Sequence, residues 1–515
     1  MSSQFIKGAV IITIATIVSK VIGSLYRIPL QNIAGDEVLG IFTIVYPVYM
    51  AILTMTVAGI PLAISKLISE ANALGKKTDI YFIYRTAAMI SLLFGVISFG
   101  LVVFFASDLA YFLGGEMVVA SLVVVSGSLV IAPYMAVHRG FFQGFEQMEP
   151  TAFSQVLEQI VRVSIIILMA YILTKGEYRD DLIAAGVMAG SFFGVLASLI
   201  YLLSLFRKRK NDLMKKTVYR FSNFITWGKK ILSLSIPICI GALAMALLNM
   251  VDSVTIPLQL KNYGYEAQEV TYLFGIYGRG LILVQMAIVL ANALVLPLIP
   301  HVTKSVVQKD LKQTREIIER TNKFAHFTAW PAAIGLVALT NPINLALFKD
   351  LEGSSVIAIL SFSSLFTAFA ILTTAILQGM DKAKLSAWIV IFCALMKFFL
   401  NLLLVSKYGL IGGACSTLVT YIIMSFLNVV VIYRTVPFSF ALKNAIFIVS
   451  SLIMGIIVFL PLPYLSFETW TRWHAFLYLL IIVPSGFLIY VGMILLFKGI
   501  TKEEIALLVK YVRKS

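Results

Sequence analysis

Residues 143–162 read QGFEQMEPTAFSQVLEQIVR, and residues 378–397, which begin 235 positions later, read QGMDKAKLSAWIVIFCALMK. Each stretch opens with a Gln-Gly-x-acid turn, continues as an apolar helix and carries one cation nineteen residues after its Gln. A helix rises about 1.5 Å per residue, so Arg162 and Lys397 each lie about 28 Å along the chain from that turn. The two stretches predict two related halves, each with one positive charge deep inside a membrane.

The composition is that of a membrane protein. Of the 515 residues, 60% are hydrophobic and 13% are charged, and the mean hydropathy is +0.95. Apolar runs longer than about 18 residues occur from end to end, which predicts an all-α polytopic membrane protein. The first apolar run continues to about residue 30 without a small-residue cleavage site, so no cleavable signal peptide is expected.

The residue types that carry out catalysis are not grouped in this sequence. The four His and three Cys show no metal-ligand spacing, and no Gly-rich phosphate-binding loop occurs. We therefore expect neither an enzyme nor a resident metal or cofactor. The net charge of +16 lies in short loops beside apolar spans, where Lys and Arg orient the chain and meet anionic lipid headgroups, so nucleic acid is not the expected partner.

Fourteen transmembrane helices are predicted. They cover about 7–33, 40–66, 82–106, 118–140, 151–174, 182–206, 228–252, 271–298, 324–347, 354–378, 385–405, 411–433, 442–462 and 474–497. If the N-terminus is cytoplasmic, the inner segments hold thirty of the 41 Lys and Arg residues and the outer segments hold seven. This asymmetry predicts that both termini are cytoplasmic.

Further matches support an internal repeat. Residues 27–31 read RIPLQ and residues 255–259 read TIPLQ, while Gly40 and Gly275 match at the longer offset of 235. Each repeat would hold six helices, an even number, so both halves insert in the same orientation. The predicted domains are an N-lobe at 1–210, a basic cytoplasmic linker at 211–230, a C-lobe at 231–437, and at 438–515 two further spans with a cytoplasmic C-terminal helix.

Seven charged residues in or beside the predicted spans are candidate substrate-binding residues: Lys20, Arg27, Arg139, Glu158, Arg162, Arg279 and Lys397. A Lys or Arg at a helix centre costs about 2.5–3.5 kcal/mol to insert, so it needs a partner, a wet cavity or a function. Glu158 lies one helical turn before Arg162, and an ion pair between them is the alternative explanation of Arg162.

The same pairing does not account for Lys20, Arg279 and Lys397, for which the sequence suggests no partner. Their presence favours a water-filled cationic cavity and an anionic substrate, and Arg suits phosphate because its planar guanidinium donates two parallel hydrogen bonds. Arg27 and Arg139 lie closer to span ends, where snorkelling to the interface explains them equally well.

Several motifs carry a resemblance to a known family. Residues 19–27 contain Ser-Lys-x-x-Gly followed by Arg27, residues 59–66 read GIPLAISK, residues 139–144 read RGFFQG, and residues 277–279 read YGR. With this order and spacing, the sequence resembles the MurJ lipid II flippases and their SpoVB relatives in the multidrug/oligosaccharidyl-lipid/polysaccharide exporter superfamily. The resemblance covers essentially the whole chain.

The resemblance implies two six-helix lobes that form a V around a central cationic cavity, with spans thirteen and fourteen forming a groove for a lipid tail. It implies that Lys20, Arg27 and Arg279 contact a diphosphate. MurJ proteins have another essential Arg in span two, but residues 39–65 contain no Lys or Arg. Either Arg139, Arg162 or Lys397 replaces it, or the substrate is a different lipid-linked saccharide.

The first functional hypothesis is a flippase that moves undecaprenyl-diphosphate-linked peptidoglycan precursor, lipid II, from the inner to the outer leaflet of a bacterial plasma membrane by alternating access. Its expected partners are the lipid-linked substrate, membrane lipids and cell-wall synthesis enzymes. The alternatives are a flippase for another lipid-linked oligosaccharide, a cation-coupled multidrug exporter, which needs more buried acids than this chain has, and a non-transporting scaffold.

Two further expectations concern mechanism. Arg279→Ala is expected to abolish transport without lowering protein abundance, because a charge in a wet cavity serves the substrate more than the fold. The membrane potential or a sodium ion is the expected driving force. Asp252 and Asn401 offer oxygens suited to sodium, and the resemblance places a sodium site in the same lobe; the alternative is that Asp252 lies at the outer interface.

Overall fold

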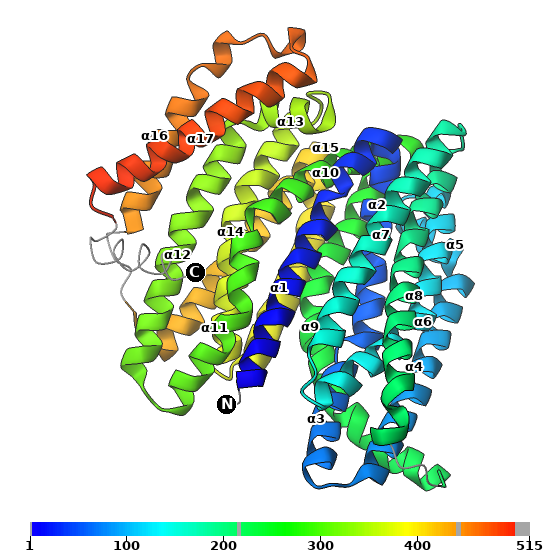
Figure 1. The fold of residues 1–515 in the computed structure, drawn as a ribbon. Helices are drawn as coiled ribbons and strands as arrows, with labels where there is room; N and C mark the ends of the chain where they lie inside the picture. Colours follow the sequence, from blue (N-terminus) through cyan, green and yellow to red (C-terminus); the bar gives the residue numbers. More distant parts are fainter. Residues whose placement is uncertain (1–2, 214–217, 439–443, 500–515) are drawn as a thin grey trace. The chain divides into compact units, whose positions relative to one another are not determined.

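The computed structural model describes residues 3–213, 218–438 and 444–499, and over these ranges all regular secondary structure is helical (Figure 1). The α-helices are α1 (Ser3–Leu25), α2 (Arg27–Val57), α3 (Ile60–Ala73), α4 (Lys77–Phe104), α5 (Ala106–Phe112), α6 (Val119–Gly144), α7 (Glu149–Lys175), α8 (Asp180–Leu213), α9 (Phe221–Tyr263), α10 (Ala267–Ala287), α11 (Val289–Val307), α12 (Leu311–Ala338), α13 (Thr340–Phe348), α14 (Ser354–Gly379), α15 (Ala383–Thr435), α16 (Asn444–Phe459) and α17 (Arg472–Leu496). Three short 3₁₀ helices are η1 (Glu116–Val118), η2 (Leu462–Tyr464) and η3 (Phe467–Thr469).

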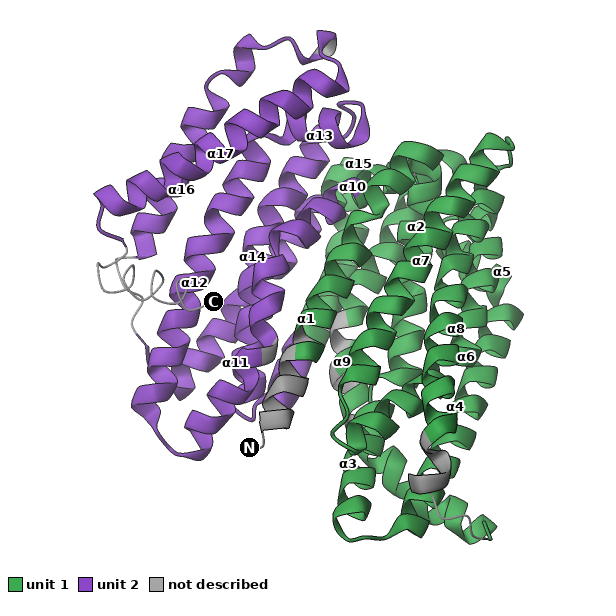
Figure 2. Ribbon diagram, in the orientation of Figure 1, with its two compact units in different colours: residues 1–278, 390–413 green, residues 279–389, 414–515 purple. Residues whose placement is uncertain are grey.

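The chain divides into two compact units (Figure 2). Unit 1 comprises Met1–Gly278 and Val390–Gly413, and unit 2 comprises Arg279–Ile389 and Ala414–Ser515. Unit 1 therefore includes α9 and the middle of α15, both of which the sequence assigns to the C-lobe. The predicted lobe boundaries and the V-shaped arrangement stay predictions. Part of the predicted linker, 214–217, and the predicted C-terminal helix over 500–515 lie outside the described residues.

Small residues allow the helices of unit 1 to approach closely. A Cβ on Gly140 of α6 would lie 2.7 Å from Pro61 O of α3, and one on Gly144 would lie 2.7 Å from Ile68 Cβ. Burial of apolar side chains gains little in lipid, because the lipid tails are equally apolar, so helix association relies on such close van der Waals contact. Substituting either glycine would push α6 away from α3.

In unit 2, α12 packs against both α14 and α16, and α17 packs against α13 and α16. Their shared core includes Leu339, Phe447, Met454 and Tyr490. The Tyr490 hydroxyl donates a 2.7 Å hydrogen bond to Phe327 O. The phenol is thus satisfied inside an otherwise apolar core, and α17 is fixed against α12.

The described helices reproduce the predicted repeat. The helices α4 and α12 both have 28 residues, and α6 and α14 both have 26. A short helix, α5 or α13, follows the first of each pair. Three turns adopt a left-handed backbone at equivalent positions 234 or 235 residues apart: Gly75 and Lys309, Gly114 and Lys349, Glu146 and Asp381. The last pair is the acid of the Gln-Gly-x-acid turn, with φ of 59° in both copies.

Ten helical segments of the described chain are long and apolar enough to cross a membrane, or twelve if each of two bent pairs is one span. Two of the ten, Ile14–Ala73 and Ala383–Thr435, have 60 and 53 residues, more than twice the roughly 20 residues that one span needs. Each is interrupted by a non-helical glycine, Gly35 with φ of 86° or Gly409 with φ of 57°. Both breaks fall in predicted loops. The count of fourteen stays a prediction.

The two repeat-related glycines quoted above meet each other. A Cβ on Gly40 of α2 would lie 1.7 Å from Thr271 O and 2.9 Å from Gly275 N of α10. A Cβ on Gly275 would lie 2.1 Å from Asp36 O of α2. The backbones of α2 and α10 therefore touch at this crossing, where only glycine fits on either helix.

Candidate functional site

The hairpin of α6 and α7 brings two arginines onto one acid, Glu158, whose side chain is 12% exposed. Arg139 Nη2 donates to Glu158 Oε2 over 2.8 Å, and Arg162 Nη2 donates to Glu158 Oε1 over 2.5 Å. Arg139 also donates to Ser154 Oγ over 3.0 Å and to Ser198 Oγ of α8 over 3.1 Å. We call these five residues the Glu158 cluster. The ion pair predicted from the spacing of Glu158 and Arg162 is confirmed, and Arg139 joins it.

Glycines of α8 allow this cluster to form. A Cβ on Gly194 would lie 2.7 Å from Glu158 O and 3.0 Å from Arg162 Cβ, and one on Gly190 would lie 2.8 Å from Arg162 O. The backbone of α8 thus lies directly against α7 beside the charged residues. A larger residue at either glycine would collide with α7.

The Glu158 cluster has a net charge of +1, because two guanidiniums share one carboxylate. Arg162 is 5% exposed, and its Nε has no hydrogen-bond partner among the described residues. A buried donor without a partner costs about 1–3 kcal/mol. Arg162 therefore retains a buried N–H that no described protein group accepts.

Arg27 provides a second such donor at the start of α2. Its guanidinium lies over the rings of Phe42 and Tyr46, at 5.4 and 5.5 Å from their centroids, and only 7% of the residue is exposed. Its Nε is buried and, within the described chain, donates to no protein group. The guanidinium of Arg27 is therefore held by aromatic faces rather than by an acid.

Lys20 lies on α1, which packs against α7. The residue is exposed, and over the described ranges its ammonium makes no hydrogen bond or ion pair. Thr16 Oγ1 contacts Gln155 Oε1 at 3.4 Å, and Gly23 lies against Gln159. Lys20, Arg27 and the Glu158 cluster therefore occupy neighbouring helices of unit 1, with a marked excess of positive charge.

Arg279 has partners that the sequence did not reveal, so the expectation that it is unpaired was wrong. In unit 2 its guanidinium donates in parallel to Asp350, with Nη1–Oδ1 at 2.6 Å and Nη2–Oδ2 at 2.8 Å. Nη1 also contacts Asn344 Oδ1 at 3.3 Å, and the guanidinium lies 5.4 Å from the centre of the Phe348 ring. This arrangement ties α10 to α13 and to the turn that follows it.

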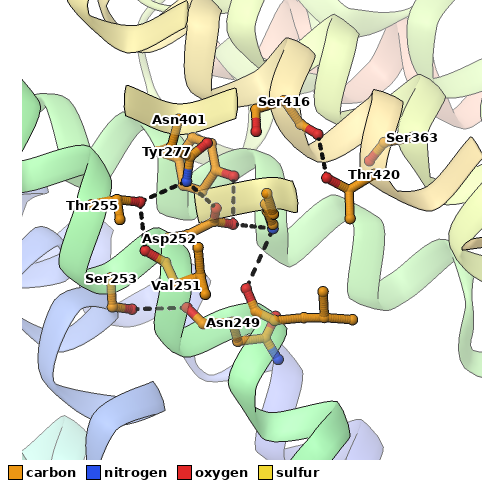
Figure 3. Close-up of polar contacts among 12 residues, drawn as sticks. Asn249, Val251, Asp252, Ser253, Thr255, Tyr277, Ser363, Asn401, Ser416 and Thr420 are labelled. Atoms are coloured by element: carbon orange, nitrogen blue, oxygen red, sulfur yellow. Dashed lines mark hydrogen bonds and ion pairs between the residues drawn. The ribbon is translucent and has the colours of Figure 1, made fainter. Parts of the chain in front are cut away.

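Lys397 also has an acid partner, again contrary to the expectation. Its Nζ lies 2.6 Å from Asp252 Oδ2, and Figure 3 shows Asp252 with Tyr277, Thr255 and Asn401 beside it. Tyr277 OH donates to the same oxygen over 2.9 Å, and Asn401 Nδ2 donates to Asp252 Oδ1 over 3.0 Å and to Thr255 Oγ1 over 2.7 Å. We call these five residues the Asp252 cluster. Asp252 is 3% exposed.

The seven predicted substrate-binding residues thus separate into distinct environments. Arg139, Glu158 and Arg162 meet, Lys397 joins the two predicted sodium ligands, and Arg279 is engaged separately in unit 2. Sequence reasoning missed Asp350 and Asn344, which lie 71 and 65 residues from Arg279. Only the bidentate geometry of arginine, which calls for a carboxylate, pointed to such a partner.

An apolar cavity of about 510 Å³ lies in unit 2 beside α12 and α16. Its lining includes Ile334, Leu452, Ile456, Phe459 and Tyr464. The helices α16 and α17 correspond to predicted spans thirteen and fourteen, for which a lipid-tail groove is expected. The described lining residues come from α12, α16 and the segment that follows α16 rather than from α17, so a groove formed by spans thirteen and fourteen stays a prediction.

The repeat and the buried charged residues define a class of membrane protein. A polytopic helical membrane protein that is built from a parallel repeat and has buried Lys and Arg side chains has the architecture of a transporter. The sequence profile of the family described as polysaccharide biosynthesis protein matches residues 5–306. This match exceeds half of the chain, and the chain belongs to that family.

Three relatives come from Bacillus subtilis (strain 168). The uncharacterized membrane protein YabM is 30% identical over 425 residues, covering 82% of this chain and 79% of that protein. The lipid II flippase MurJ is 27% identical over 483 residues, covering 89% and 88%. Stage V sporulation protein B is 25% identical over 510 residues, covering 97% of both. The predicted resemblance to MurJ and SpoVB proteins is confirmed.

Solved structures show the same fold. The lipid II flippase MurJ in an inward closed conformation aligns with 95% of this chain and 98% of that chain, with a TM-score of 0.70 and 16% identity. A multidrug resistance MATE family transporter of the MOP superfamily, in an inward-facing conformation, aligns with 85% of this chain and 95% of that chain, with a TM-score of 0.61 and 16% identity. At these identities the likeness concerns the fold alone.

Proposed function

We propose that this protein is a flippase for a saccharide linked to a lipid through an anionic diphosphate, with lipid II as the first candidate substrate. The observation that carries the proposal is the excess of buried positive charge in unit 1, where Arg27 and Arg162 each keep an Nε that no described protein group accepts. A diphosphate has oxygens that can accept hydrogen bonds from these two Nε–H groups. The name of one relative, the lipid II flippase MurJ, agrees with the proposal.

Arginine suits this task because its planar guanidinium donates two parallel hydrogen bonds to one phosphate and remains charged at any physiological pH. Buried cations would replace the hydration that the diphosphate loses when it enters the low-dielectric interior. The apolar cavity beside α12 and α16 would accept part of the lipid tail. In this proposal, Arg162 and Arg139 replace the arginine that MurJ proteins have in span two and that this chain lacks.

The charges disfavour a multidrug exporter for cationic compounds. Such a site needs a buried carboxylate that is free to hold the drug. Glu158 is shared by two arginines, and Asp252 is paired with Lys397. Glu158 and Asp252, the two acids of unit 1 that the sequence singled out, are therefore already neutralised by the protein itself.

Reconstitution tests the proposed function directly. Purified protein in liposomes that contain fluorescent lipid II is expected to make the inner-leaflet fraction accessible to an external quencher within minutes, whereas protein-free liposomes should not. Fluorescent phosphatidylcholine serves as the control for nonspecific scrambling. Movement of phosphatidylcholine at the same rate as lipid II, or export of a cationic dye in place of lipid movement, would contradict the proposal.

We further propose that the protein lies in a bacterial plasma membrane with both termini cytoplasmic, close to the enzymes of cell-wall synthesis that make and use its substrate. The asymmetry of Lys and Arg predicts that Lys77 faces the cytoplasm and that Glu177 faces outward. In a variant with its three native cysteines replaced by alanine, Glu177→Cys should react with a membrane-impermeant maleimide in intact cells. Lys77→Cys should react only after permeabilisation. The reverse pattern would exclude this orientation.

A further inference from the structure

Asp252, the acid that the sequence suggests as a sodium ligand, forms an ion pair with Lys397 of the same protein. The Asp252 and Lys397 side chains are 5% and 1% exposed, and their charged atoms lie 2.6 Å apart. Lys397 Nζ is also 3.4 Å from the backbone oxygen of Leu248. The ammonium thus lies between a carboxylate and a carbonyl oxygen, which are the ligands that a bound hard cation would use.

The hydrogen-bond directions around Asp252 are those of an ion pair rather than of a metal site. Thr255 Oγ1 donates to Val251 O over 2.6 Å, so it accepts from Asn401 Nδ2. The same nitrogen donates to Asp252 Oδ1, which directs the amide oxygen of Asn401 away from the carboxylate. Tyr277 OH also donates to Asp252. A sodium ion bound to Asp252 needs further oxygens that face it. Asn401 Nδ2 and Tyr277 OH instead present hydrogens to the carboxylate.

The charges lead to the same conclusion. Asp252 and Lys397 cancel within a buried environment. A sodium ion added to this pair would leave one uncompensated positive charge there, and burial strongly opposes such a charge. A sodium ion could bind Asp252 only if the ammonium were first withdrawn.

We infer that Lys397 is a tethered counter-cation that excludes sodium from Asp252 and thereby sets the ion specificity of this site. Removal of the ammonium creates a site for a monovalent cation. A tethered cation cannot be exchanged across the membrane in a transport cycle, so this cluster does not couple transport to a sodium gradient. The inference concerns ion binding and holds whichever substrate the protein carries.

Thermal unfolding in detergent tests the inference without a transport assay. The midpoint is measured at equal concentrations of sodium chloride and N-methyl-D-glucamine chloride, whose cation is too large for a buried site. The wild type should show the same midpoint in both salts. Lys397→Gln replaces the ammonium by an amide, and its midpoint should rise with sodium by about 1–2 °C for each tenfold increase above the dissociation constant.

Two controls isolate the cluster. Lys384→Gln removes an exposed cation from the same helix and should leave the wild-type behaviour unchanged. The double variant Asp252→Asn/Lys397→Gln lacks the carboxylate and should lose the sodium response. Binding of radioactive sodium to the wild type provides a measurement that needs no variant, and none should be displaced by excess unlabelled sodium.

Two results would overturn the inference. One is sodium-specific stabilisation of the wild type that Asp252→Asn abolishes, because Asp252 would then bind sodium despite the ammonium. The other is a folded Lys397→Gln variant without any sodium response, because Lys397 would then not occupy a cation site. If Lys397→Gln does not fold, saturable binding of radioactive sodium to the wild type, lost in Asp252→Asn, decides against the inference, and its absence supports it.

Discussion

Arg27→Ala is expected to slow lipid II translocation in proteoliposomes by roughly 10- to 150-fold, which corresponds to the loss of about 1.5–3 kcal/mol from hydrogen bonding to a charged group. Arg27 is held over Phe42 and Tyr46, and its Nε is unpaired within the described residues. The substitution leaves no buried acid without a partner, so the amount of folded protein should change little. The measurement is the initial rate at equal protein incorporation.

Two variants complete this experiment. Arg27→Lys keeps the charge but loses the planar guanidinium, so it should restore the rate only in part. Arg179→Ala removes an arginine that is 81% exposed and paired with Asp181, and it should translocate lipid II at the wild-type rate. A normal rate for Arg27→Ala would show that this guanidinium is not a substrate contact.

Substitution of Asp350 is expected to destabilise the protein more than its exposure suggests. The Asp350 side chain is 39% exposed, whereas that of Arg279 is fully buried. Exposed ion pairs contribute about 0–1 kcal/mol, but Asp350→Asn leaves a buried cation uncompensated and should cost about 3–5 kcal/mol. Arg279→Met should cost less, about 2–3 kcal/mol, because a carboxylate that reaches solvent stays hydrated. Thermal unfolding and abundance in membranes report both effects.

The comparison separates a structural role of Arg279 from a role in substrate binding. A structural role predicts that Asp350→Asn and Arg279→Met both lower abundance, and that any remaining protein translocates lipid II at a substantial rate. Normal abundance of Arg279→Met together with loss of transport would restore the expectation drawn from the sequence. In that case the Asp350 carboxylate would have to release Arg279 when substrate binds.

The helices and the repeat were predictable because each follows from local signals. Apolar runs identify spans, and the Gln-Gly-x-acid turn recurs with the same backbone conformation at Glu146 and Asp381. The breaks at Gly35 and Gly409 also fall where hydropathy places loops. The division of the chain was not predictable, because the assignment of α9 to unit 1 depends on packing between segments distant in sequence.

The difference between local and distant contacts also explains which partners of the charged residues could be predicted. The pair of Glu158 and Arg162 follows from helical spacing alone, since residues four apart share a face. The partners of Arg279 and Lys397 lie 71 and 145 residues away, and no periodicity connects such positions. Asp350 in particular lies in a short loop, where an acid is ordinary and suggests no partner.

The contact between Gly40 and Gly275 has a consequence for the history of the chain. Two equivalent residues of a repeat touch each other only on the axis that relates the copies. In an ancestor with a single repeat, this glycine would have met its own counterpart in a second subunit, as residues on the twofold axis of an isologous dimer do. After duplication the two positions became free to diverge, yet both remain glycine, because a methyl group on either would collide with the other helix.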